Sequence, residues 1–69
     1  MEIFNDAKSI KSEMNKKIME SCEGNVSITF KIAEKNFTKI TEPLKDEYSI
    51  IAEKLDNEFF NLDVEWKRN

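Results

Sequence analysis

Two carboxylates near the end of the chain are the first candidates for chemistry. Asp63 and Glu65 stand two residues apart, between Leu62, Val64 and Trp66. In an extended strand such residues point to the same side, with α-carbons about 6.5–7 Å apart. Carboxylate pairs serve glycoside hydrolysis and two-metal catalysis, but only inside a cleft and with further ligands. Because 69 residues leave little room for a cleft, we interpret the pair as the solvated side of a strand, or as part of an acidic surface for a partner.

Other reactive residue types are sparse. The chain has no histidine, which removes the commonest general base and metal ligand. The lone cysteine, Cys22, adjoins an apolar helical stripe, and we interpret it as an inert, partly buried hydrophobe. One glycine cannot build a phosphate-binding loop, and no zinc or calcium spacing is present. We therefore predict a protein that is not an enzyme and that has neither a cofactor nor a metal site.

The net charge of −3 is unevenly distributed along the chain. Residues 1–41 contain seven lysines and six acidic residues, which is a charge of +1. Residues 42–65 contain eight acidic residues and two lysines, which is a charge of −6, and residues 66–69 return +2. An asymmetry of this kind can steer a basic partner toward the acidic part.

The lysines of the first half are a weaker signal for nucleic acid. Phosphate binding usually needs a concentrated basic patch and a strongly positive domain. Here acidic residues interrupt the lysines, arginine occurs once, and no stacking aromatics alternate with the basic residues. This pattern argues against direct nucleic-acid binding and favours a solvated helix face.

Composition predicts one globular domain, spanning residues 1–69, rather than a disordered chain. No window approaches the run of about 18 apolar residues that a membrane span needs, and the start lacks the pattern of a signal peptide. A single cysteine allows no internal disulfide, so we expect a reducing, cytoplasmic setting. Ten lysines against one arginine, with many Ile and Asn, suggest an AT-rich bacterial or phage genome.

Periodicity predicts the first two elements. Steps of three and four place the apolar residues between Ile3 and Ile18 on one side of a helix, which Gly24 is suited to stop in a left-handed conformation. Asn5 or Asp6 is a candidate N-cap, and that start would free residues 1–4 for a short strand. Residues 26–32 then alternate between apolar and polar side chains, which predicts a strand.

The second half predicts a further helix and strand. Residues 34–36 suit a three-residue turn with Asn36 left-handed, followed by an optional strand over 37–41. The stretch 41–43 is typical of a helix start, because Pro43 suits a first turn, and apolar steps of three and four continue to Leu55 and as far as Phe59. Asn57 would stop this helix, and residues 60–66 alternate as a second clear strand.

These elements predict an α/β (α+β) fold, a small two-layer sandwich in the order helix–strand–(strand)–helix–strand. Two helices would cover one face of a two- or three-stranded sheet. The other face would carry the polar residues Ser27, Thr29, Lys31, Asn61, Asp63 and Glu65. A strand at residues 1–4 would turn the order into that of a miniature ferredoxin-like fold.

The functional prediction is a small acidic binding protein, a regulator or inhibitor that docks on a basic protein surface, including one that normally meets nucleic acid. Phe37 and Phe59 enter because adjacent Phe59 and Phe60 cannot both face inward, and an exposed aromatic in a small protein indicates an interface. The alternative is a homodimeric structural or nucleic-acid-binding module that uses the lysines of the first helix. The predicted partner-binding residues are Asp46, Glu47, Glu53, Asp56, Asp63, Glu65, Phe37 and Phe59.

Overall fold

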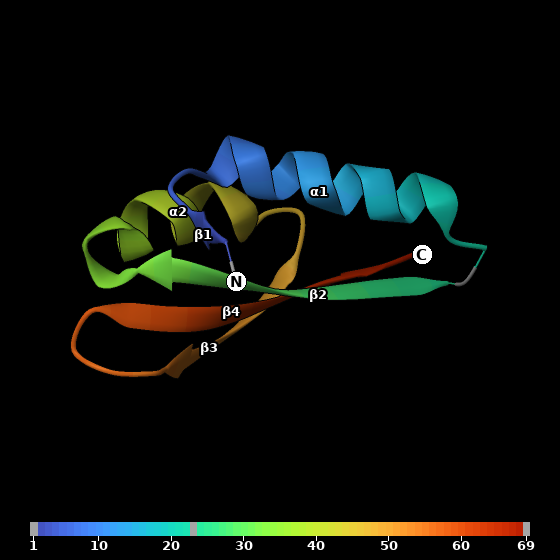
Figure 1. Ribbon diagram of the computed structural model, residues 1–69. Helices are drawn as coiled ribbons and strands as arrows, with labels where there is room; N and C mark the ends of the chain where they lie inside the picture. Colours follow the sequence, from blue (N-terminus) through green and yellow to red (C-terminus); the bar gives the residue numbers. More distant parts are fainter. Residues whose placement is uncertain (1, 23, 69) are drawn as a thin grey trace.

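Two helices lie over one face of a four-stranded sheet in the computed structural model, which describes residues 2–22 and 24–68 (Figure 1). The elements follow in the order β1 (Ile3–Phe4), α1 (Ala7–Glu20), β2 (Asn25–Ala33), η1 (Glu34–Asn36), α2 (Phe37–Leu44), β3 (Ser49–Lys54) and β4 (Phe59–Lys67). This arrangement confirms the α/β (α+β) sandwich with both helices on one face, with more strands than the two or three expected.

The sheet is built around the antiparallel pair β2 and β4, in the spatial order β1-β2-β4-β3. β1 runs parallel to β2 at one edge, and β3 runs antiparallel to β4 at the other. The helix–strand order differs from a ferredoxin-like fold, because the third strand follows α2 and pairs with the fourth as a hairpin. That part of the prediction is therefore wrong.

The first helix forms as its stripe predicts. It begins after Asp6, one of the two predicted N-caps, and not at Ile3. Asp6 is the N-cap, and its Oδ1 accepts a hydrogen bond of 2.8 Å from the Ser9 N–H. The Ser9 backbone N–H, and then the Ser9 side chain, lower the pKa of the Asp6 carboxyl. Because the helix starts after this cap, Ile3 and Phe4 are free to pair with β2, which confirms the short N-terminal strand.

The second helix was predicted in the wrong place. It spans Phe37–Leu44, with Pro43 in its last turn instead of its first, and the predicted strand at 37–41 does not form. The three-residue step from Phe37 to Ile40, which fits a strand poorly, is ordinary for a helix. Pro43 has no N–H to donate within the helix, and the helix ends one residue later.

The predicted continuation of that helix is the strand β3. Leu44 and Tyr48 are buried as expected, but Ile51 and Leu55 are 69% and 43% exposed. Their helical spacing is coincidental, because this segment gains backbone hydrogen bonds from β4 and β-branched Ile50 and Ile51 fit a strand.

Two predicted turn conformations are also wrong. No residue in the described parts of the chain, Gly24 included, has a positive φ angle. Helix α1 ends at Glu20, where the cap Ser21 is extended and its N–H bonds to the carbonyl of Ile18. Residues 34–36 form the 3₁₀ helix η1 and lead directly into α2, with φ of −103° at Asn36. Neither position therefore needs the left-handed conformation.

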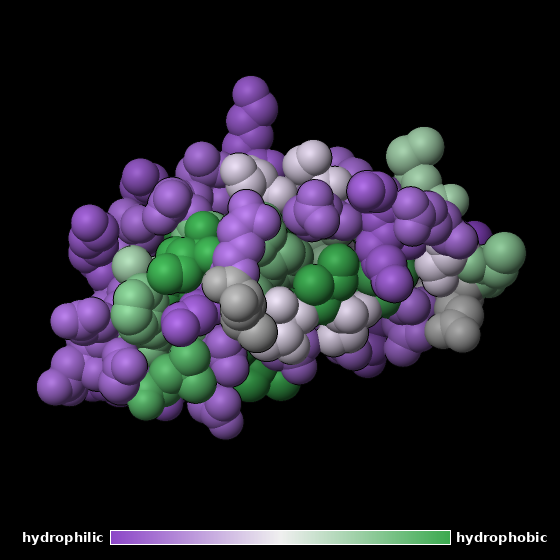
Figure 2. Space-filling view, in the orientation of Figure 1, coloured by the Kyte–Doolittle hydropathy of each residue, from purple (hydrophilic) through white to green (hydrophobic). Residues whose placement is uncertain are grey.

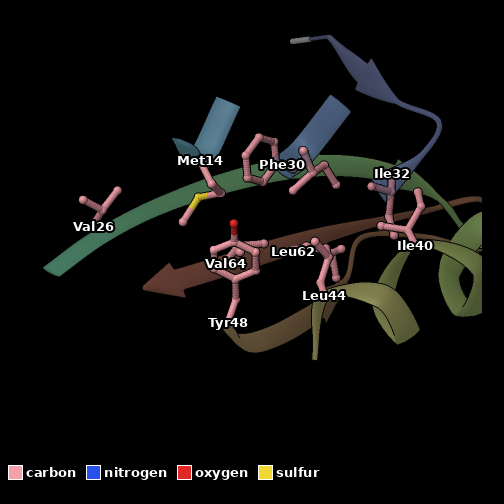
Figure 3. Close-up of a cluster of buried hydrophobic side chains, with 10 residues drawn as sticks. Met14, Val26, Phe30, Ile32, Ile40, Leu44, Tyr48, Leu62 and Val64 are labelled. Carbon is pink, nitrogen blue, oxygen red and sulfur yellow. The ribbon is translucent and has the colours of Figure 1, made fainter. Parts of the chain in front are cut away.

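The hydrophobic core fills the space between the helices and the inner sheet face (Figure 3). Side chains from α1, α2, β2 and β4, together with Tyr48 in the turn before β3, form the core. Ile50 of β3 packs against it. Its buried members are Ile10, Met14, Val26, Phe30, Ile32, Ile40, Leu44, Tyr48, Leu62 and Val64. Phe4 meets Phe30 edge-on at the β1 end, with ring centroids 4.9 Å apart. A single small core of this kind makes each buried side chain a large share of the stability.

Truncating Leu62 tests this dependence. Leu62 is fully buried in the central strand β4, so Leu62→Ala should lower the free energy of unfolding by about 2–5 kcal/mol. Met19→Ala is the control, because Met19 is 85% exposed and should change the value by less than about 0.5 kcal/mol. Urea unfolding followed by circular dichroism measures both, and equal losses would contradict the assigned core.

Tyr48 predicts a loss of stability at alkaline pH. Burial first, and the Glu47 carboxylate second, raise the pKa of its phenol above the ordinary value of 10.0. The folded state therefore holds this proton more tightly than the unfolded chain. The contribution is fully present below pH 10 and is lost as the pH rises through the higher pKa of the folded state.

The measurement follows the phenolate absorbance of Tyr48, the only tyrosine in the chain, together with urea unfolding between pH 9 and 12. Tyr48→Phe is the control and should show a smaller loss of stability over the same range. A Tyr48 absorbance that titrates as in the urea-unfolded protein would show that folding does not protect the phenol.

Candidate functional site

The uncovered side of the sheet brings the candidate residues together. We call it the open face, and define it by the outward side chains of β2, β3 and β4. These are Ser27, Thr29, Lys31, Ser49, Ile51, Glu53, Phe59, Asn61, Asp63 and Glu65. All six polar residues expected on this side of the sheet are among them. Seen from the side, with the helices above and the sheet below, the surface is mostly hydrophilic with separate apolar patches (Figure 2).

Strand register places three carboxylates on a diagonal across the open face. Asp63 lies opposite Ile51, and Glu53 lies opposite Asn61 one row along. Glu53 is therefore a diagonal neighbour of Asp63, at about 7–8 Å, and Glu65 follows Asp63 along β4 at about 6.5–7 Å. The exposed Ile51 side chain stands beside this diagonal. The result is an acidic surface with an exposed apolar residue beside it on the edge strand.

The three carboxylates differ in their partners. Asp63 Oδ1 accepts a hydrogen bond of 2.7 Å from the Ser27 hydroxyl, and Glu65 Oε1 lies 3.8 Å from the Lys67 ammonium. Within residues 2–22 and 24–68, the Glu53 carboxylate makes no hydrogen bond or ion pair. Glu53 therefore keeps its full capacity to accept hydrogen bonds from another molecule.

A depression in the open face is lined in part by Asn61, whose side-chain oxygen is buried. The depression has a volume of about 290 Å³ and is lined by Thr29, Ile51, Glu53, Asn61 and Asp63. The Asn61 Oδ1 atom is buried and has no hydrogen-bond partner among the described residues. An unsatisfied buried acceptor costs about 1–3 kcal/mol, so this oxygen lowers the stability of the fold.

The acidity of this side is set against a basic helix layer. The segment 49–67, which forms β3, β4 and their turn, contains five acidic residues and two lysines, for a charge of −3. Helix α1, on the other side of the sheet, contains four lysines and two glutamates, for a charge of +2. Helix α1 thus has a positive charge and the β3–β4 hairpin a negative charge, on opposite sides of the sheet.

Of the four acidic candidates predicted on the second helix, Asp46 and Glu47 lie away from the open face. Asp46 and Glu47 are exposed in the turn between α2 and β3, on the helix side of the sheet. The Glu47 carboxylate lies 3.7 Å from the ammonium of Lys11 on α1. This contact connects the turn to α1 and adds little stability at such exposure.

Asp56 has a local structural role in the turn between β3 and β4. Its Oδ1 accepts hydrogen bonds from the backbone N–H groups of Glu58, at 2.7 Å, and Phe59, at 3.0 Å. The side chain thereby closes the hairpin in the manner of an Asx-turn. Its carboxylate oxygen is already occupied by two donors.

The two aromatic candidates separate to opposite faces. Phe37 packs against Phe60 with ring centroids 4.7 Å apart, on the helix-covered side of the sheet. Phe59 lies on the open face, where the Lys31 ammonium sits 4.6 Å from its ring centroid. Of the two aromatic candidates, only Phe59 therefore lies on the open face, and its neighbour there is a lysine.

The structure also describes what surrounds other reactive groups. Among residues 2–22 and 24–68 no three His, Cys, Asp or Glu side chains are grouped to hold a metal ion. Cys22 is exposed, in contrast to the partly buried position expected from the helical stripe, because α1 ends before reaching it. Neither described helix has both the length and the apolar character to cross a bilayer.

Ile51 and Asn61 line the depression, but the sequence did not indicate either of them as a binding residue. Ile51 was assigned to the buried stripe of a helix, and Asn61 was read only as a solvated strand residue. The β-branched run Ile50-Ile51 is the signal that could have indicated a strand there. No pattern in the sequence could have indicated that the Asn61 acceptor is left without a donor.

Comparisons with known proteins add no assignment to this geometry: no protein-family model, no curated protein and no solved structure matches the chain. The open face is therefore the structural basis for the proposed function.

Replacing Asn61 tests whether its acceptor carries a stability cost. Asn61→Val removes the unsatisfied oxygen and should raise the free energy of unfolding by about 1–2 kcal/mol. Thr29→Val is the matched control, since it introduces the same side chain on the same face at an exposed position. Urea unfolding measures both variants. If Asn61→Val gains no more than Thr29→Val, the acceptor is not a source of strain.

Proposed function

We propose that the chain is a non-enzymatic acidic binding protein, a regulator or inhibitor that docks its open face on a basic surface of a protein partner. The observation that supports this proposal is the depression in the open face, where Glu53, Asp63 and Asn61 line a hollow beside the exposed Ile51. This set of groups accepts hydrogen bonds and carries negative charge.

A lysine or arginine side chain of the partner has the complementary chemistry. Its aliphatic stem packs on the Ile51 side chain, and its charged end donates to the carboxylates of Glu53 and Asp63. Arginine suits the site best, because its planar guanidinium presents five N–H donors that can bridge the two carboxylates. Partners with clustered basic residues, including proteins that normally hold nucleic acid, present such side chains.

The charge polarity of the molecule supports the same orientation. The acidic side would approach a basic surface first, while the α1 lysines would be kept away from it by like-charge repulsion. Long-range attraction of this kind raises association rates and weakens as salt is added. Both effects follow from charge on the open face and need no catalytic group.

The test is capture of bacterial proteins on the immobilised chain, with identification by mass spectrometry and measurement of the dissociation constant for the captured protein. Glu53→Gln/Asp63→Asn should weaken binding about tenfold or more, because it removes the charge from two hydrogen bonds. Glu13→Gln/Glu20→Gln changes the net charge equally on the exposed side of α1 and should leave binding nearly unchanged.

Two results would contradict the proposal. One is a captured partner that binds the open-face variant as tightly as the wild-type chain. The other is equal weakening by both double variants, which would indicate that only the total charge matters. Circular dichroism of each variant ensures that a loss of binding is not a loss of fold.

A further inference from the structure

The free edge of the sheet is a second feature without a described partner. Strand β3 is the last in the sheet order, and within the described chain only its β4 side is paired. Its middle residues, Ile50, Ile51 and Ala52, are apolar, and the strand contains no proline. Natural monomers usually protect such an edge with charge, proline or a bulge. Here the two charged residues, Glu53 and Lys54, stand only at its end.

The backbone of β3 shows which groups this edge offers. The Leu55 N–H donates to the Phe59 carbonyl at 3.0 Å, and the same register continues along the whole strand. Because antiparallel pairing alternates, Ile51 and Glu53 direct their N–H and C=O groups toward β4, whereas Ile50 and Ala52 direct theirs outward. The outward groups have the spacing with which another extended strand can pair.

We propose that this edge pairs with the β3 edge of a second copy of the chain, antiparallel and about a twofold axis beside Ile51. Twofold symmetry keeps opposed side chains on the same face, so only a few registers exist. In the register centred on Ile51, the two Ile51 side chains meet on the open face. Ile50 meets Ala52 on the inner face, and Ser49 meets the Glu53 carboxylate, to which its hydroxyl can donate.

Charges favour the same register. Lys54 then lies just beyond the paired residues, beside the turn of the second copy that contains Glu47, a residue of opposite charge. A register centred on Ala52 would set Ile51 against Glu53. A register centred on Ile50 would pair only Ser49–Ile51, because Glu47 and Tyr48 lie in the turn before β3. The strand is therefore self-complementary in one register.

The pair forms one eight-stranded sheet, with four helices on one face and two open faces joined on the other. The acidic surfaces of the two copies become continuous across the Ile51 contact. This pairing does not depend on the proposed binding function, because the backbone groups of the β3 edge form it and a basic partner is not required. The interface consists of one pair of short strands, and so small a contact gives a dissociation constant on the order of micromolar to millimolar.

Sedimentation equilibrium up to about 1 mM protein tests the pairing. The weight-average mass of the wild-type chain should rise from one chain mass toward two as the concentration increases. Ile51→Lys and Ile51→Glu should each weaken dimerisation about tenfold or more, because equal charges then face each other across the axis. An equimolar mixture of the two variants should recover the dimer. Ile51 is exposed, so neither change disturbs the core.

A backbone variant tests the same edge without adding charge. Ala52→Pro removes an N–H that points away from β4 and should give a monomer, whereas Ala52→Val keeps that N–H and should remain a dimer. A wild-type chain that stays monomeric at about 1 mM would overturn the proposal and leave the edge to a strand of another protein. Self-association strengthened by Ile51→Lys would also overturn it, because lysine would then face Glu53 in the register centred on Ala52.

Discussion

The antiparallel pairing of β2 with β4 is the interaction on which the rest of the structure depends. Each strand has nine residues, and the pairing joins segments that are far apart in the chain, from Asn25 opposite Lys67 to Ala33 opposite Phe59. Its register puts Phe30 beside Leu62 on the inner face. A slip of one residue would turn every apolar side chain of one strand toward water, so burial of the core and the register of the sheet support each other.

The same pairing determines the surface that can act on other molecules. Once Leu62 and Val64 face the helices, Asp63 must face outward, and β3 can add Glu53 and Ile51 only on that same side. An acidic face with an apolar residue at its β3 edge is thus a consequence of strand alternation. The Asn61 acceptor, buried on this face without a donor, is the one feature that burial of the core does not explain. Unsatisfied groups of this kind are typical of places where a protein sacrifices stability for binding.

Periodicity predicted the elements whose local pattern and tertiary role agree. Helix α1, β2 and β4 each have one apolar side over several turns or alternations, so they and the two-layer arrangement followed from the sequence. The segment from Leu44 to Leu55 satisfied a helical pattern equally well, yet its second part is a strand. Short apolar runs are ambiguous in this way, because residues spaced by three and four can lie in a helix, a turn and a strand in succession.

The amino-acid sequence by itself determined that one small α/β (α+β) domain forms, with Asp63 and Glu65 on the solvated side of its last strand. Local periodicity is sufficient for that, because each side of a helix or strand must face either the core or water. Only the tertiary structure decided that Glu53 and Ile51 join them, that Asp56 is occupied in a turn and that β3 leaves a free edge. The reason is that β3 gains its backbone hydrogen bonds from β4, and no local pattern encodes which distant strand will supply them.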